Sequence, residues 1–186
     1  MRAKPLNEAA LFEYALKILG ARAITSGELK VKLRRRAERL ADVDPILSKL
    51  KDYGYLNDKK FAENYAARRL ENEGLGRMKV LSDLRAKRVA PAVAERAVGE
   101  AYAESDEVAL IERFLARKYR RQPISVVISD VKGMASAFRK LRAAGFSGGN
   151  ALSVLKRHAK DAAAAEALET LESSEDLTSG ENSGEL

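Results

Sequence analysis

The sequence predicts an all-α protein of three tandem three-helix repeats, helix-turn-helix-like, that form an elongated, curved array with an acidic C-terminal extension. Three observations support this prediction. Apolar residues recur at helical spacing along most of the 186 residues. Three segments share one apolar pattern, and each has a helical segment on either side. The four prolines lie at the edges of the expected elements, where a helix tolerates them.

The internal repeat centres on three triplets whose second and third members lie one helical turn apart on a buried stripe. The triplets are Thr25/Leu29/Leu33, Gly76/Val80/Leu84 and Asp130/Met134/Phe138. The nine expected helices cover 8–21, 28–39 and 44–53, then 59–72, 76–88 and 91–103, then 106–120, 131–142 and 148–158. The expected repeats are 1–57, 58–105 and 106–160. Because a short three-helix unit buries little apolar surface alone, neighbouring repeats should pack on one another.

Local residues mark several helix starts. Thr25, with Glu28 three residues later, has the pattern of a capping box. A proline at the first helical position favours a helix start, with or without a polar cap before it. The other expected starts are Asp44-Pro45, Ala90-Pro91 and either Ser147 or Asn150.

Glycine beside an aromatic residue marks two helix ends, at Tyr53-Gly54-Tyr55 and at Gly145-Phe146. Glycine supplies the left-handed conformation of a C-terminal cap, and the aromatic ring is expected to fold back on the apolar face.

Two stretches fall outside the helical pattern. Residues 124–128 (ISVVI) are β-branched and have no strand partner, so we expect an extended linker. The tail, 161–186, is acidic; 161–172 has high helix propensity and 173–186 has the composition of a disordered segment.

Charge is distributed unevenly along the chain. The net charge of +7 divides into +15 for residues 1–160 and −8 for the tail. The second helix of each repeat carries +4, so these three helices hold most of the positive charge. A row of basic helices is typical of a surface that neutralises phosphates or an acidic groove. The predicted binding residues are Lys30, Lys32, Arg34, Arg35, Arg36, Arg77, Lys79, Arg85, Lys87, Arg88, Lys132, Arg139, Lys140 and Arg142.

Composition excludes several classes of site. There is no cysteine, and His158 is the only histidine, so thiolate zinc sites and most histidine-dependent catalysis are excluded. Gly74-Leu75-Gly76 lacks the third glycine of a dinucleotide loop and a preceding strand. No apolar run is long enough to span a membrane, and residues 1–10 (MRAKPLNEAA) lack the apolar core expected of a secretory signal. We therefore expect a cytoplasmic, monomeric protein that is not an enzyme and has no cofactor or metal.

Residues 54–69 read GYLNDKKFAENYAARR, and this segment resembles the signature of the RecX family. The matching residues are Gly54, Tyr55, Leu56, Asp58, Phe61, Ala62, Tyr65 and Arg69. Weaker similarity extends over about residues 10–158 and leaves 122–130 and the acidic tail without a counterpart.

The resemblance implies three tandem three-helix repeats and a non-enzymatic regulator of the RecA recombinase. Such a protein would bind RecA filaments on single-stranded DNA, and DNA itself, and inhibit recombinase, ATPase and co-protease activities in DNA repair and the SOS response. The alternative from the residues alone is a sequence-tolerant DNA-binding protein, for single or double strands, without a recombinase partner. The acidic tail either competes with DNA for the basic helices or aids solubility.

Overall fold

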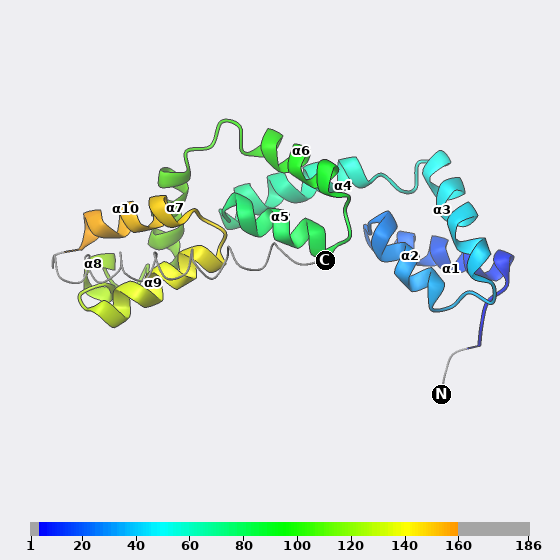
Figure 1. Ribbon diagram of the computed structural model, residues 1–186, viewed down its shortest axis with the longest axis horizontal. Helices are drawn as coiled ribbons and strands as arrows, with labels where there is room; N and C mark the ends of the chain where they lie inside the picture. Colours follow the sequence, from blue (N-terminus) through cyan, green and yellow to red (C-terminus); the bar gives the residue numbers. More distant parts are fainter. Residues whose placement is uncertain (1–3, 160–186) are drawn as a thin grey trace, which may run out of the picture. The chain divides into compact units, whose positions relative to one another are not determined.

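The computed structural model describes residues 4–159 of the chain, and the acidic tail lies outside the described residues (Figure 1). Within residues 4–159 the secondary structure is helical apart from one isolated bridge between Leu6 and Ala37. The all-α prediction is therefore confirmed. The elements are α1 (Glu8–Ala21), α2 (Ser26–Arg34), η1 (Leu40–Asp42), α3 (Val43–Asp52), α4 (Asp58–Arg68), the π-helical η2 (Arg69–Glu73), α5 (Arg77–Ala86), α6 (Pro91–Ala101), α7 (Glu107–Lys118), α8 (Ile124–Val127), α9 (Val131–Ala143) and α10 (Gly148–His158).

The described chain separates into two compact units. One contains residues 4–68 and 81–103, and the other contains 69–80 and 104–159. The boundary runs through α5, whose first four residues belong to the second unit and whose last six belong to the first. The division at 57 and 105 is a different way of partitioning the chain, and it stays a prediction.

The apolar anchors of the internal repeat all lie in the core. Their side chains are at most 2% exposed at Leu29, Leu33, Val80, Leu84, Met134 and Phe138. The first member of each triplet directly precedes α2, α5 or α9. The shared pattern therefore marks the same structural position three times, at the starts of α2, α5 and α9.

The expected helix over 28–39 is wrong at its C-terminal end, because α2 ends at Arg34. The following residues pair with the N-terminal segment instead. The amide of Leu6 donates to the carbonyl of Arg36 (2.7 Å), and the amide of Glu38 donates to the carbonyl of Leu6 (2.8 Å). These long-range hydrogen bonds replace those that a longer helix would have made.

The prediction of an extended linker at 124–128 is also wrong, because residues Ile124–Val127 form the short helix α8. Gly133 of α9 makes this packing possible: a Cβ at that position would lie 2.0 Å from the Val127 carbonyl oxygen. Asp130 then caps α9 by accepting the Gly133 amide at 2.6 Å. Tertiary packing here overrides the β-branched composition.

The helix starts are mostly as expected. Pro91 is the first residue of α6, and Ser147 immediately precedes α10. At α3 the expectation is wrong, because the helix begins at Val43 and the N-cap position is Asp42 rather than Asp44. The turn η1 leads into this start, and the buried Asp42 carboxylate accepts from the Arg39 guanidinium at 2.8 Å.

The two glycine helix ends differ in what they bury. Gly54 and Gly145 have φ of +76° and +89°, as the left-handed cap requires. Phe146 is fully buried, as predicted, against Phe114. Tyr55 is instead 57% exposed, and the following residue, Leu56, fills the core position. The expectation that the ring of Tyr55 folds inward is therefore wrong.

The start of α2 is held by neighbouring elements of the first unit. The buried Thr25 hydroxyl accepts the Glu28 amide at 3.0 Å and donates to the Lys87 carbonyl at 2.5 Å. The Ser26 amide donates to the Asp58 carboxylate at 2.8 Å. One threonine thus caps its own helix and satisfies a carbonyl just beyond the end of α5.

Replacing Thr25 with valine should lower the free energy of unfolding by about 1–3 kcal/mol, because the Lys87 carbonyl loses its donor and α2 loses its cap. Urea denaturation followed by circular dichroism measures this loss. Thr25→Ser keeps the hydroxyl and serves as the control. Equal stability of the valine variant and the wild type would contradict the dual role.

In the second unit, the first residue of α7 holds the start of α10. Glu107 accepts hydrogen bonds from the Ser147 amide (3.0 Å), the Ser147 hydroxyl (2.5 Å) and the Asn150 side-chain amide (2.5 Å). Burial would raise the pKa of Glu107, but these hydrogen bonds and the charge of Arg142 outweigh it, so the pKa is lowered. The charged carboxylate is thus the form that the folded state prefers.

We expect Glu107→Gln to cost about 1 kcal/mol of stability near neutral pH, since a charged acceptor becomes a neutral one. A lowered pKa in the folded state adds stability above the ordinary value of 4.5, and this stability is lost as the pH falls through the folded-state pKa. The gap between variant and wild type should therefore close on acidification. Urea titrations at neutral pH and at about pH 3 test this, and a gap independent of pH would refute it.

Candidate nucleic-acid interface

None of the fourteen predicted cations is buried. Five are half-buried, namely Lys30, Lys32, Arg36, Lys79 and Lys87, and the other nine are exposed. Their surroundings differ from one residue to the next within each unit.

On α2 the cations divide into engaged and available residues. Lys30 pairs with Asp44 at 2.6 Å, and the Arg36 guanidinium lies 5.2 Å from the centroid of the Tyr14 ring. Lys32, Arg34 and Arg35 pair with no carboxylate of residues 4–159. Arg34 and Arg35 are also exposed, so this end of α2 presents two cations to solvent.

The C-terminal end of α5 and the residues directly after it, in the same unit, present a second group. Arg85 pairs with Glu95 at 3.4 Å, and the Lys87 ammonium lies 5.5 Å from the Tyr65 ring centroid. Arg88 is exposed and has φ of +60°, a conformation that glycine usually occupies. Arg88 also packs closely on Gly27: a Cβ added at Gly27 would lie 2.5 Å from the Cβ of Arg88 and 2.5 Å from its carbonyl oxygen.

The two groups in this unit are not brought together. Arg88 lies at the N-terminal end of α2, where Gly27 is located, whereas Arg34 and Arg35 lie at the opposite end. A helix of nine residues is about 13 Å long, so α2 separates the groups by roughly that distance. Contacts with phosphates would therefore be made at separate points.

In the second unit the start of α5 meets the end of α9. The Gly76 amide donates to the Ala144 carbonyl (2.8 Å), and the Met78 amide donates to the Gly145 carbonyl (3.2 Å). Free amides at one helix start thus satisfy free carbonyls at another helix end. The contact brings Arg77 and Lys79 to the end of α9, where Arg142 donates to the Phe146 carbonyl at 3.0 Å.

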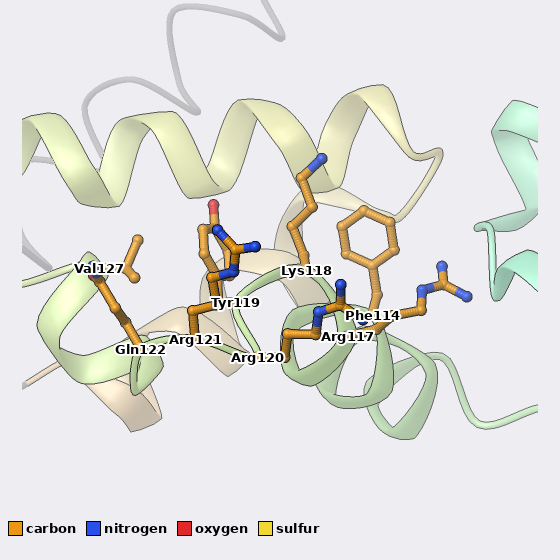
Figure 2. Close-up of a pocket in the computed structure, with 8 residues that line it drawn as sticks. All are labelled: Phe114, Arg117, Lys118, Tyr119, Arg120, Arg121, Gln122 and Val127. Atoms are coloured by element: carbon orange, nitrogen blue, oxygen red, sulfur yellow. The ribbon is translucent and has the colours of Figure 1, made fainter.

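A cationic hollow at the end of α7 was missed by the sequence analysis. Figure 2 shows the residues that line it, including Arg117, Lys118, Arg120 and Arg121, with the rings of Phe114 and Tyr119. The Arg117 guanidinium donates to the carbonyls of Asn72 (3.1 Å) and Glu73. The predicted residue Lys140 of α9 donates to the hydroxyl of Tyr119, one of the lining residues, at 3.2 Å.

The signal for this hollow was present in the sequence. Residues 113–121 contain five basic and no acidic residues, but residues 104–112 contain four acidic and no basic ones. Counting charge over the whole expected helix, 106–120, averages the two halves and hides the basic end. A shorter window would have found it.

The residues that carry the family resemblance are largely structural. Asp58 accepts from the start of α2, Ala62 is fully buried, and the rings of Phe61 and Tyr65 stack with centroids 6.1 Å apart. The Tyr65 hydroxyl donates to Asp83 of α5 at 3.1 Å. Arg69 forms an ion pair with Glu73 inside η2.

Residues 4–159 contain no cluster of histidine and carboxylate side chains that could hold a metal ion. His158 instead contacts the Glu112 carboxylate at 2.7 Å. None of the helices in this range has the length and apolar character needed to cross a membrane.

Comparison with known proteins gives consistent matches. The family profile described as "RecX, second three-helix domain" matches residues 57–98. The chain is 31% identical to "Regulatory protein RecX" of Pelodictyon phaeoclathratiforme over 134 residues, 72% of this chain and 76% of the relative. It is 32% identical to the protein of that name from Deinococcus radiodurans over 143 residues, 75% of this chain and 63% of the relative.

The fold is also similar to a solved structure. The crystal structure of RecX from Lactobacillus salivarius superimposes with a TM-score of 0.59 at 22% identity, covering 81% of this chain and 96% of that chain. This similarity concerns the fold alone.

Proposed function

Because the chain belongs to the RecX family of regulatory proteins, we propose that it regulates a RecA-type recombinase by binding its filament on single-stranded DNA. The proposed effect is inhibition of the recombinase, ATPase and co-protease activities, in DNA repair and the SOS response. The protein would act by binding, without a catalytic step of its own.

One observation carries the binding part of this proposal. The three basic helices α2, α5 and α9, with the residues directly after them, keep exposed cations that pair with no carboxylate of residues 4–159: Arg34 and Arg35, Arg77 and Arg88, Lys132 and Arg139. Lysine and arginine neutralise phosphates without reading sequence. Several weak contacts within one chain add through effective concentration, which suits a repeating polyanion. Contacts to adjacent protomers would alter filament growth and block access of other DNA.

The test is the rate of single-strand-dependent ATP hydrolysis by a RecA-type recombinase with increasing amounts of this protein. We expect hydrolysis to fall as the protein is added. Unchanged hydrolysis, with equal affinity for bare DNA and for the filament, would support a plain DNA-binding protein and overturn the recombinase partner.

A further inference from the structure

We propose that the hollow at the end of α7 binds the phosphate backbone of single-stranded DNA through Arg117, Lys118, Arg120 and Arg121. This site lies outside the three basic helices that the sequence predicted. The proposal deepens one part of the proposed function, the contact of lysine and arginine side chains with DNA phosphates, and rests on that part, not on the recombinase partner.

The lining of the hollow suits an anion. Its eight lining residues include four cations and no carboxylate (Figure 2). Lys118, Arg120 and Arg121 are exposed and pair with no carboxylate anywhere in residues 4–159. Like charges in one cluster repel each other and a bound anion relieves this repulsion, so the lining favours an anionic ligand.

The geometry fixes part of this cluster before any ligand arrives. Arg117 is anchored by the carbonyls of Asn72 and Glu73, and its guanidinium lies 5.9 Å from the Phe114 ring centroid. Lys140 is held over the Tyr119 ring at 5.3 Å from its centroid, with its ammonium bonded to the hydroxyl. Arg117 and the Tyr119 ring, two of the lining groups, are thus held in place by contacts with other residues.

Stabilisation of the C-terminal end of α7 explains only two of the four cations that line the hollow. Cations in the last turn of a helix interact favourably with its carbonyl end, and Arg117 and Lys118 occupy that turn. Arg120 and Arg121 lie beyond the C-cap residue Tyr119, where this effect has fallen off. These two arginines therefore need another reason for their place beside the hollow.

The chemistry favours a nucleic-acid backbone over a free nucleotide. Sites for nucleotide phosphates usually use backbone amides at a helix start or a glycine-rich loop. The hollow instead lies at the carbonyl end of α7 and is lined by long side chains spread along five residues. A single strand is flexible enough to follow a concave surface, whereas a duplex resists bending.

The experiment measures binding of the full-length protein to a labelled oligo-dT strand by fluorescence anisotropy over a salt series. The test variant is Arg120→Gln with Arg121→Gln. We expect affinity to fall about tenfold at low salt, and the slope of log K against log salt to become shallower by about 1.4, since each single-strand contact contributes about 0.7.

Two matched variants control for charge and for geometry. Lys17→Gln with Lys51→Gln removes the same charge from exposed positions of the first unit and should leave the slope unchanged. Arg120→Lys with Arg121→Lys keeps the charge and should retain most of the binding. Circular dichroism checks that each variant is folded.

Several outcomes would overturn the proposal. An unchanged affinity and slope in the Arg120/Arg121 variant would do so, and so would an equal loss in the Lys17/Lys51 variant. Displacement of the strand by ATP at a matched phosphate concentration would assign the hollow to free nucleotides instead. Because no recombinase is present, failure here leaves the inhibition of ATP hydrolysis untouched, and failure of that inhibition leaves this result untouched.

Discussion

Reversing one exposed cation on each basic helix should weaken binding to single-stranded DNA and to the recombinase filament by about 10- to 100-fold at low salt. The changes are Arg34→Glu, Arg77→Glu and Arg139→Glu. Each of these arginines is exposed and pairs with no carboxylate of residues 4–159. Arg85 is avoided because it pairs with Glu95, so its reversal would place two carboxylates side by side and would not report on phosphate contact alone. Anisotropy measures DNA binding, and ATP hydrolysis measures the effect on the filament.

The matched control makes the same change in net charge elsewhere. Lys17→Glu, Lys51→Glu and Lys60→Glu alter exposed cations that lie outside α2, α5 and α9. If this control loses as much affinity as the test variant, long-range attraction rather than local contact explains the binding. If the test variant binds as tightly as the wild type at moderate salt, the three helices are not the binding surface.

Replacing Gly76 with alanine should lower the free energy of unfolding by about 3 kcal/mol or more. An added Cβ would lie 2.3 Å from the carbonyl carbon and oxygen of Gly145 and 2.5 Å from the Phe146 amide nitrogen. These are backbone atoms and cannot rotate away. Relieving the clash requires α5 and α9 to separate, which breaks the hydrogen bonds from the Gly76 and Met78 amides.

Gly149 supplies the control for this prediction. It lies in α10 of the same unit, and an added Cβ would meet nothing within 4 Å. Gly149→Ala should therefore stabilise the protein by up to about 1 kcal/mol, because alanine has the higher helix propensity. Urea denaturation compares the two variants directly. Equal effects from both substitutions would show that the close approach at Gly76 is not a tight constraint.

The helical part of the fold follows from local signals in the sequence. Apolar periodicity predicts the core residues Leu29, Leu33, Val80 and Leu84, because a buried stripe must repeat with the helical turn. Pro91 predicts the start of α6 from its fixed φ and missing amide. These signals depend on a few neighbouring residues, so one sequence is enough to read them.

What the sequence analysis missed depends on contacts between distant residues. The helix α8 forms in a β-branched segment because Gly133, which has no side chain, leaves room for the Val127 carbonyl. No local sequence pattern predicts this contact. Asp58 caps a helix that begins 32 residues before it. Arg88 adopts a positive φ that is usual for glycine, and the identity of the residue gives no sign of it.

The candidate interface was predicted only as a list of cations. The sequence identified the charged residues of α2, α5 and α9, but it did not show that Lys30 and Arg85 are already paired with carboxylates. It also did not show that the cations at the end of α7 line a common hollow, or that Lys140 donates to Tyr119 at its edge. Pairing and shared cavities are properties of the folded chain, so a charge count cannot separate free cations from engaged ones.

The docking of α5 on α9 restricts how such a protein can gain or lose repeats. A chain shortened after Ala103 would keep α4, α5 and α6 in full, yet the Gly76 and Met78 amides would lose the Ala144 and Gly145 carbonyls that accept from them. The first turn of α5 would then open to water although every residue of its own helix group is present. A duplication or deletion of three helices at that point would therefore need a new surface to close this helix start.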